Sequence, residues 1–175
     1  MSFKDFEAAI KSSELRSVAL HWNEARGAKR MPGWKDIDPT AIGPHLKIIW
    51  SWKYDSSSDS FTGRIAGDDI TQVFGESLRG KRMKDFFAGK HYDMVFTRHK
   101  RVVTEPAFAH GSGNVFIHAR HYGLGERIIM PLAADGVHGD GILGATIYSA
   151  NPNAQQGTIP ERYLEAEKVD FFPID

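Results

Sequence analysis

The order of strand-like and helix-like segments predicts an α+β fold, in which an antiparallel sheet has its helices over one face. Two strand-like segments are followed by several short helices and then by three or four further strand-like segments. Strands grouped in blocks favour antiparallel pairing, because parallel strands alternate with the helices that connect them. The length of 175 residues suits one domain, whose core buries roughly 70% of the unfolded surface.

Two amphipathic helices are predicted at the start of the chain. The first has an apolar stripe at helical spacing, formed by Phe3, Phe6, Ala9 and Ile10. The second follows Ser12 and Ser13, and its stripe consists of Leu15, Val18, Ala19 and Trp22. Gly27 is typical of the residue that ends such a helix. Both stripes need an apolar surface to pack on, because helices this short are marginal in water.

The first block of strands is predicted to be a hairpin. Asp38 and Pro39 are typical of a helix start, so a helical turn should run to about Gly43. Residues 46–54 are rich in aromatic and β-branched side chains and indicate a strand. Residues 61–66 are expected to be its antiparallel partner, across a polar loop.

The middle of the chain is predicted to be helical. Short helices are expected at residues 69–74 and near residues 83–87. A longer helix over about residues 92–103 has one apolar face, formed by Tyr92, Val95, Phe96, His99, Val102 and Val103. Glu105 and Pro106 end it, because a residue before proline is biased away from helical geometry.

The last block is predicted to contain strands at residues 107–110, 114–122, 126–133 and 141–149. We interpret the glycines in residues 111–113 and 123–125 as turns between them. The stretch that follows carries three prolines and many polar residues, which is typical of a surface arm.

Composition excludes several classes of chemistry. The sequence has no cysteine, which removes disulfides, thiolate metal sites and cysteine nucleophiles and fits a reducing cytoplasm. The 22 Lys and Arg balance 22 Asp and Glu, so no net field attracts nucleic acid or an anionic membrane. No apolar run approaches the ~20 residues that cross a bilayer. We therefore expect a cytoplasmic protein with neither nucleic-acid nor membrane partners.

A set of residues along the chain resembles the signature of a bacterial PAS family, the type-five PAS domains, many of which are short stand-alone chains. The matching positions in the first half are His21-Trp22, Arg26, Pro32, Asp36-Ile37-Asp38-Pro39, Arg64-Ile65-Ala66-Gly67, Phe74-Gly75 and Gly80. Residues 126–132 and 142–145 resemble the last two strands of that family. The resemblance runs from about Leu15 to Tyr148.

This resemblance implies a five-stranded antiparallel sheet, helices over one face and a cavity between them. In the superfamily such domains serve sensing and protein contacts, and no reaction is implied. The expected organisation is an N-terminal amphipathic helix in residues 1–14, a PAS-like domain in residues 15–150 and a C-terminal surface arm in residues 151–175.

A cavity in such a fold would have a mainly apolar lining with a few polar groups, as small-molecule sites usually do. The candidate lining residues are Phe74, Phe87, Phe96, His99, Phe108, His110 and Ile129. They would hold a small apolar or amphipathic ligand between the long helix and the sheet. The same side chains would equally form a filled core, so a ligandless protein-interaction adaptor is the alternative to a sensor. A small enzyme or a haem- or metal-binding protein is a third alternative, which the sequence favours less.

The eight histidines do not form a metal-binding pattern. His91 and His99 are about two helical turns apart, which is too far for one ion. His118 and His121 lie three apart in a predicted strand and therefore point to opposite faces. His99 alone is placed as an axial haem ligand would be, but a core histidine with one hydrogen bond explains it better. We predict no required cofactor and no metal.

Two kinds of charged residue are assigned structural roles. Arg64 lies in a predicted strand, where a buried guanidinium needs a carboxylate, and Asp36 or Asp38 is the expected partner. The basic clusters at residues 79–84 and 98–101 are short and are interpreted as solvated faces. No serine lies in a nucleophile elbow, so no catalytic residue is predicted.

The first apolar stripe precedes the family resemblance and needs a partner surface. PAS domains often pair through helices before the sheet, so we expect a homodimer whose interface includes Phe3, Phe6 and Ile10. The chain's own sheet is the alternative surface. Signalling is expected to pass to a separate output protein.

Overall fold

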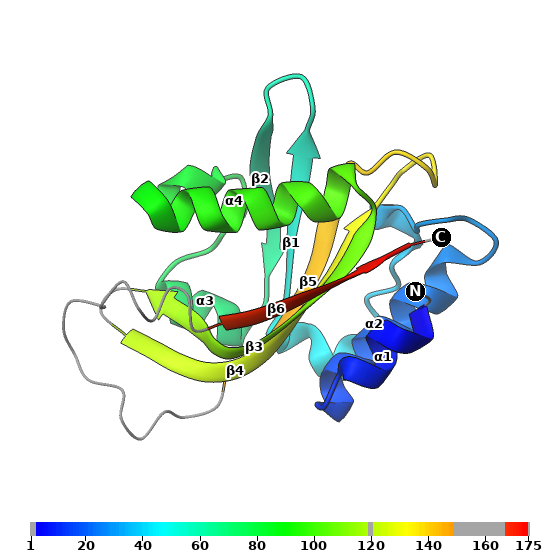
Figure 1. Ribbon diagram of the computed structural model, residues 1–175, viewed down its shortest axis with the longest axis horizontal. Helices are drawn as coiled ribbons and strands as arrows, with labels where there is room; N and C mark the ends of the chain where they lie inside the picture. The colour runs from blue at the N-terminus through cyan, green and yellow to red at the C-terminus, as the bar shows by residue number, and fades with distance from the viewer. Residues whose placement is uncertain (1–2, 119–120, 149–166, 175) are drawn as a thin grey trace.

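An antiparallel sheet of six strands organises the residues described by the computed structural model, which are 3–118, 121–148 and 167–174 (Figure 1). The strand order is β2-β1-β5-β4-β3-β6. The strands are β1 (Ile49–Asp55), β2 (Ser60–Ala66), β3 (Ala107–His118), β4 (His121–Leu132), β5 (Gly141–Tyr148) and β6 (Glu167–Pro173). The predicted α+β class is therefore confirmed, with one strand more than expected.

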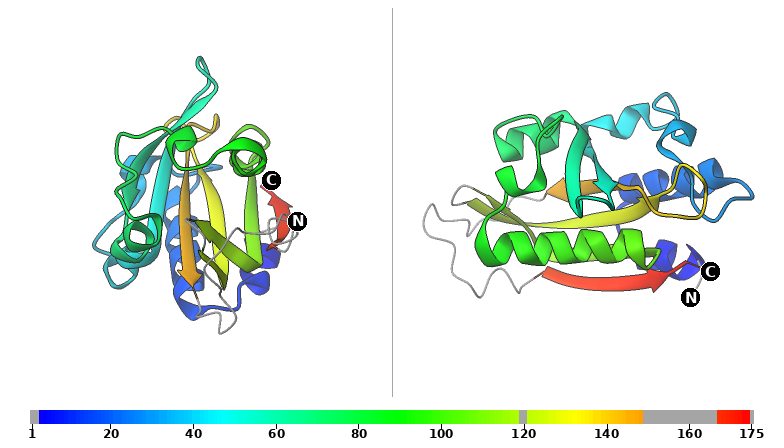
Figure 2. Two further views of the ribbon diagram at one scale, coloured as in Figure 1. Left: turned by 90° about the vertical axis from the view of Figure 1, so that its left-hand side faces the viewer. Right: turned by 90° about the horizontal axis from the view of Figure 1, so that it is seen from above.

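Helices cover both faces of this sheet rather than one (Figures 1 and 2). The helices α1 (Phe3–Ala9) and α2 (Ser13–Arg26) pack on one face, and α3 (Asp68–Phe74) and α4 (Gly89–Thr104) pack on the other. Short 3-10 turns lie at Trp34–Asp36, Gly43–Ile48 and Met83–Asp85. The N-terminal helices thus add a second layer, which encloses a second hydrophobic core.

The helix ends follow the local sequence. The Ser12 hydroxyl accepts the main-chain N–H of Leu15 at 3.3 Å and begins α2, and Gly27 ends it as predicted. Gly75 ends α3 with a φ of 77°, a conformation that glycine adopts without strain. The predicted strand at residues 46–54 begins only at Ile49, because Gly43–Ile48 continue as a 3-10 helix with Pro44 in its first turn.

The glycines interpreted as turns lie inside strands. β3 runs unbroken through residues 111–113, and β4 runs unbroken through residues 123–125. The two strands pair through these segments, with Gly113 opposite Gly125. Glycine within a strand marks a close approach of another group to the backbone, which the pattern of glycines alone does not distinguish from a turn.

The end of the chain is not a surface arm. Residues 167–173 form β6, which pairs with β3 along its length, and Ile174 donates its main-chain N–H to Pro106. Residues 151–166 of the predicted arm lie outside the described residues. The Phe172 ring lies 5.7 Å from the Phe6 ring, so the end of β6 lies beside the first turns of α1 (Figure 2).

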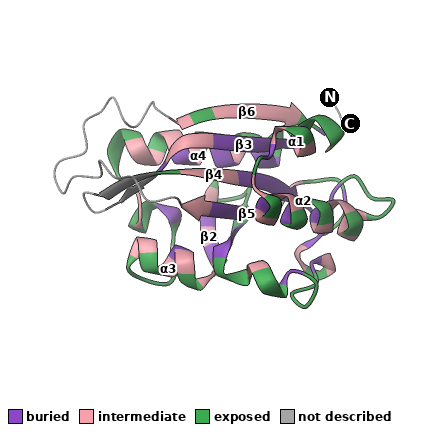
Figure 3. Cartoon of the chain, turned by 90° about the horizontal axis from the view of Figure 1, so that it is seen from below, coloured by how far each residue is buried: buried purple, intermediate pink, exposed green. Residues whose placement is uncertain are grey.

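Most residues of the central strands are buried, because the sheet is covered on both faces (Figure 3), and successive side chains alternate between the two cores. Trp50, Trp52 and Tyr54 of β1 all face α4. In β3, Phe108 faces the N-terminal helices and Ala109 faces α4. This alternation decides which predicted site residues meet.

Candidate functional site

A cavity of about 50 Å³ lies between α3, α4 and the sheet. A buried water needs roughly 10 to 15 Å³ on this measure, so the space suits a few waters or a ligand of a few non-hydrogen atoms. Apolar side chains line it from β1, β3, α3, α4 and the segment after α3, namely Trp50, Trp52, Phe74, Leu78, Phe87, Met94, Val95 and Val115. Polar side chains line it mainly from β3, β4, β5, β6 and α4, namely His91, Arg98, His99, Asn114, Arg127, Thr146, Tyr148 and Glu167.

Three charged side chains from three distant elements converge at the polar wall. Arg98 of α4 donates from Nη1 to Glu167 Oε2 of β6 at 2.7 Å. Arg127 Nε of β4 lies 2.9 Å from Glu167 Oε1. The exposed fractions of the side chains are 9% for Arg98, 16% for Arg127 and 4% for Glu167. The cluster is therefore almost completely withdrawn from bulk water.

Gly111 makes room for this cluster. It lies in β3 beside Glu167, and a methyl group at position 111 would overlap the Glu167 carboxylate and press on the Arg127 side chain. The missing side chain lets the Glu167 carboxylate reach both arginines across β3.

The charges of the cluster do not balance. Two guanidinium groups share one carboxylate, which leaves one positive charge without a partner among the described lining residues. Burial lowers the pKa of Arg98, Glu167 opposes that change, and Arg127 adds to it by repulsion. Both arginines nevertheless stay cationic, because guanidinium does not lose its proton in proteins.

Two polar atoms of the cluster lack directed hydrogen bonds. The N–H of Arg127 Nε does not point at Glu167 Oε1, so both atoms are buried without a hydrogen bond. Asn114 Oδ1, on the same wall, is also buried and unpartnered. Buried polar atoms in a filled core are nearly always hydrogen-bonded, so these atoms mark a wall that faces a polar occupant.

His99 is a buried, uncharged histidine in the cavity wall. Burial, reinforced by the nearby Arg98 charge, lowers its pKa to about 3. Its Nδ1 lies 2.7 Å from the carbonyl oxygen of Val95, one turn back along α4, and a neutral ring donates to that oxygen. The ring packs between Trp50 and Phe61.

Thr146 and Tyr148 of β5 are two further polar residues of the lining. Trp50 Nε1 donates to Thr146 Oγ1 at 2.8 Å, which joins β1 to β5. Burial raises the pKa of the Tyr148 hydroxyl to about 12, so it remains protonated near neutral pH.

Three of the seven predicted cavity residues line the cavity. Phe74, Phe87 and His99 do so. Phe96 lies on α4 but packs on Phe61 and Tyr92, outside the lining. Ile129 is buried on the same face of the sheet without reaching the cavity.

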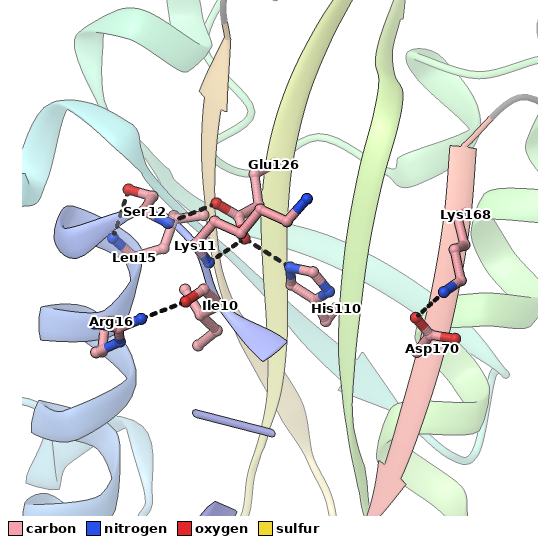
Figure 4. Close-up of polar contacts among 9 residues, drawn as sticks. All are labelled: Ile10, Lys11, Ser12, Leu15, Arg16, His110, Glu126, Lys168 and Asp170. Atoms are coloured by element: carbon pink, nitrogen blue, oxygen red, sulfur yellow. Dashed lines mark hydrogen bonds and ion pairs between the residues drawn. The ribbon is translucent and has the colours of Figure 1, made fainter. Parts of the chain in front are cut away.

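Phe108 and His110 were placed on the wrong face by the prediction. Ala109 and its cross-strand partner Ile129 face α4. Phe108 and His110, on either side of Ala109, therefore point to the other face, toward the N-terminal helices. Phe108 stacks on Phe6 with ring centroids 4.5 Å apart. His110 Nε2 lies 2.7 Å from Glu126 Oε1 (Figure 4).

Glu126 fastens the corner between α1 and α2 to the sheet (Figure 4). Its carboxylate accepts the main-chain N–H of Lys11 at 2.7 Å and that of Ser12 at 2.8 Å. Burial by itself would raise the Glu126 pKa, but these two donors and His110 outweigh it, and the pKa lies below its ordinary value. His110 is thus a structural partner of this carboxylate.

The predicted pair between Arg64 and Asp36 or Asp38 does not form. Arg64 stacks over the Trp34 ring at 5.2 Å, and partial burial lowers its pKa while the Asp140 carboxylate opposes that change. Asp36 instead accepts from Lys29 at 2.8 Å and from the Gly33 N–H at 2.7 Å, and Asp38 accepts the Thr40 N–H. Both aspartates therefore bind groups close to them in sequence, and neither binds Arg64 in β2.

The side chains predicted for the dimer interface pack inside their own chain. Phe6 and Ile10 have exposed fractions of 0% and 1%, and Phe3 contacts Phe6 and Phe108. The chain's own sheet is therefore the surface that the stripe covers. Phe6 and Ile10 are not accessible to a second copy.

Sequence reasoning missed the charged centre of the site. Arg98 belongs to the cluster interpreted as a solvated face, yet it is buried. Glu167 belongs to the predicted surface arm, and 69 residues separate it from Arg98. Two features of the sequence relate to this centre. Arg98 directly precedes His99, which belongs to the apolar face of the long helix, and Gly111 lies in a segment predicted to be a turn. Neither feature indicates a charged partner.

Comparison with known proteins agrees with this architecture. A family model described as PAS domain matches residues 10–147. The chain therefore belongs to the PAS domain family, whose members are in general sensory or regulatory domains. No curated protein matches the chain.

Two further observations concern the described residues alone. They include no helix that has both the length and the apolar character to cross a membrane. They also include no group of three or more His, Asp or Glu side chains placed to hold a metal ion.

Proposed function

We propose that this chain is a cytoplasmic sensory domain that binds a small molecule in the cavity between α4 and the sheet. Its state is passed on by association with a separate output protein. The observation that carries this proposal is the polar wall, where Asn114 Oδ1 and Arg127 Nε are buried without hydrogen bonds beside an open space. A ligandless adaptor with a filled core gives no reason for these atoms to stay unpaired.

The lining also has the composition of a small-molecule site. Aromatic and aliphatic side chains form much of the lining, together with a smaller set of polar groups that can orient a ligand. Glu167 connects this wall to β6, whose far end lies against α1. A ligand that binds at this charged cluster would therefore act on a strand that reaches the surface at the edge of the sheet, where a partner can respond to it.

The proposal is tested by a thermal-shift screen with a library of small metabolites. A ligand at 100 times its dissociation constant adds about 2.7 kcal/mol to the free energy of unfolding. For a domain of this size that raises the melting temperature by roughly 5 to 10 °C. Native mass spectrometry of the purified protein provides a second measurement, because it detects a ligand carried through purification.

A cavity-filling variant locates the binding site. Val95→Phe places a ring in the cavity from α4 and is expected to abolish the shift. Phe96→Trp is the matched control, because it enlarges the next side chain of the same helix outside the lining. If no compound stabilises the wild-type chain, or if Val95→Phe binds as well as wild type, the ligandless adaptor becomes the better explanation.

A further inference from the structure

The cavity holds one buried positive charge that its described lining residues do not neutralise. Arg98 and Arg127 both approach Glu167, and among the described lining residues no second carboxylate is present. A buried charge is unfavourable unless an opposite charge lies close to it. The site therefore favours an occupant that carries a single negative charge.

The arginines present suitable donors to such an occupant. Arg98 directs Nη1 at Glu167, and a guanidinium has five N–H groups in all. Arg127 Nε is buried without a hydrogen bond. Guanidinium groups match carboxylates in charge and in planar geometry, so two of them facing one space form a carboxylate-binding pair.

The size and the apolar lining of the cavity define the rest of the occupant. A volume of about 50 Å³ suits a molecule of only a few non-hydrogen atoms. Phe74, Leu78 and Phe87 provide an apolar part of the same lining. A dianion would exceed the single free positive charge, and a nucleotide would exceed the volume.

We infer that the ligand is a small monocarboxylate with a short apolar tail, whose carboxylate binds Arg98 and Arg127 beside Glu167. This inference rests on the proposed function, since it names the chemical class of the molecule sensed. The tail lies against Phe74, Leu78 and Phe87. Bound in this way, the ligand completes the charge balance of the cluster that fastens the start of β6.

The inference is tested by calorimetric titration with straight-chain monocarboxylates from acetate to hexanoate and with their primary amides, at constant ionic strength in chloride. The acids are expected to bind with an optimum at short chain length, and the amides about tenfold more weakly or worse, because they lack the charge. Equal binding of acids and amides would overturn the inference. Binding of chloride alone, with no dependence on the tail, would also overturn it.

Three variants connect binding to the named residues. Arg127→Gln leaves a balanced Arg98–Glu167 pair, and it should lower the affinity for the acids about tenfold or more without changing that for the amides. Glu167→Gln increases the free positive charge and should raise the affinity for the acids. Arg101→Gln is the matched control, because it removes the same charge one turn along α4 from a side chain that is half exposed and outside the lining.

The outcomes separate this inference from the proposed function. Circular dichroism establishes whether each variant is folded. If Glu167→Gln loosens β6, the comparison of Arg127→Gln with wild type is sufficient to test the inference. Unchanged acid binding in folded Arg127→Gln would refute the carboxylate assignment. If no acid binds but another metabolite stabilises the wild-type chain and not Val95→Phe, the sensory function stands and the carboxylate class is wrong.

Discussion

Individual buried polar residues give this domain a chemistry that its near-neutral composition conceals. His99 is buried between aromatic rings, and Arg98 beside it forms an ion pair with Glu167. One of these two neighbours in sequence is thus neutral and the other is charged. Guanidinium keeps its proton even when buried, and Glu167 balances its charge, whereas His99 meets only a carbonyl oxygen and rings and stays neutral.

The neutral state of His99 makes the stability of the fold depend on pH. Its pKa is about 3 in the folded chain, against 6.5 for an unperturbed histidine. Since the unfolded chain takes up the proton first, this contribution to stability is complete above pH 6.5 and is lost as the pH falls toward 3. The slope approaches ~1.4 kcal/mol per pH unit. His99→Phe should therefore lose less stability than wild type between about pH 7 and about pH 4, measured by urea unfolding.

The phenylalanine in this variant preserves the packing against Trp50 and Phe61. His138→Gln is the control, because the His138 side chain is 86% exposed. It should follow the wild-type pH dependence. Parallel curves for His99→Phe and wild type would show that His99 is not the group responsible.

At the scale of elements, β6 shows how a segment without a clear strand pattern becomes part of the sheet. Its residues alternate between the two cores, with Phe172 packed toward Phe6 and Phe171 beneath the Arg101 guanidinium at 4.0 Å. Its first residue, Glu167, supplies the carboxylate of the cavity. The pairing with β3 also covers what would otherwise be a long exposed edge.

We expect the end of this segment to contribute to global stability. Ile174 is 7% exposed and packs in the N-terminal core, and its carbonyl oxygen accepts from Arg30 at 2.7 Å. Ile174→Ala should lower the free energy of unfolding by about 2 kcal/mol. Lys168→Ala, at a side chain that is 75% exposed, should change it by less than about 0.5 kcal/mol. If chemical denaturation gives equally small changes in the free energy of unfolding for both variants, the end of the chain behaves as a surface arm.

The whole molecule consists of one sheet between two hydrophobic cores. The N-terminal core contains Phe6, Trp22 and Phe108, and the opposite core contains the β1 aromatic residues beneath α4. The cavity belongs to the second core. The N-terminal helices therefore act as a structural layer, and a homodimer, if formed, needs a surface other than Phe6 and Ile10.

This arrangement predicts the effect of a change in α1. Phe6→Ala removes a fully buried ring stacked on Phe108 and should lower the free energy of unfolding by about 3 to 5 kcal/mol, independently of protein concentration. Multi-angle light scattering should give the same molar mass as for wild type. Lys4→Ala, on the exposed face of α1, is the control. A folded Phe6→Ala chain with a lower molar mass than wild type would show that Phe6 contributes to a dimer interface.

The sequence by itself determined the class of fold and most of its elements. Apolar spacing predicted α1, α2 and α4, and aromatic and β-branched content predicted the β1–β2 hairpin. These properties are local, because a helical stripe or a strand is specified by residues a few positions apart. The cavity that the family resemblance implies, together with these local signals, led to Phe74, Phe87 and His99, which do line it.

Only the tertiary structure decided which face each strand residue occupies and which charges meet. Phe108 and Ala109 are neighbours in sequence, yet they belong to different cores, because side chains alternate along a strand and register fixes their direction. Arg98 and Glu167 meet across 69 residues because β6 pairs with β3 and Gly111 leaves space for the carboxylate. Such contacts depend on the packing of the complete sheet, and the residues adjacent in sequence carry no record of them.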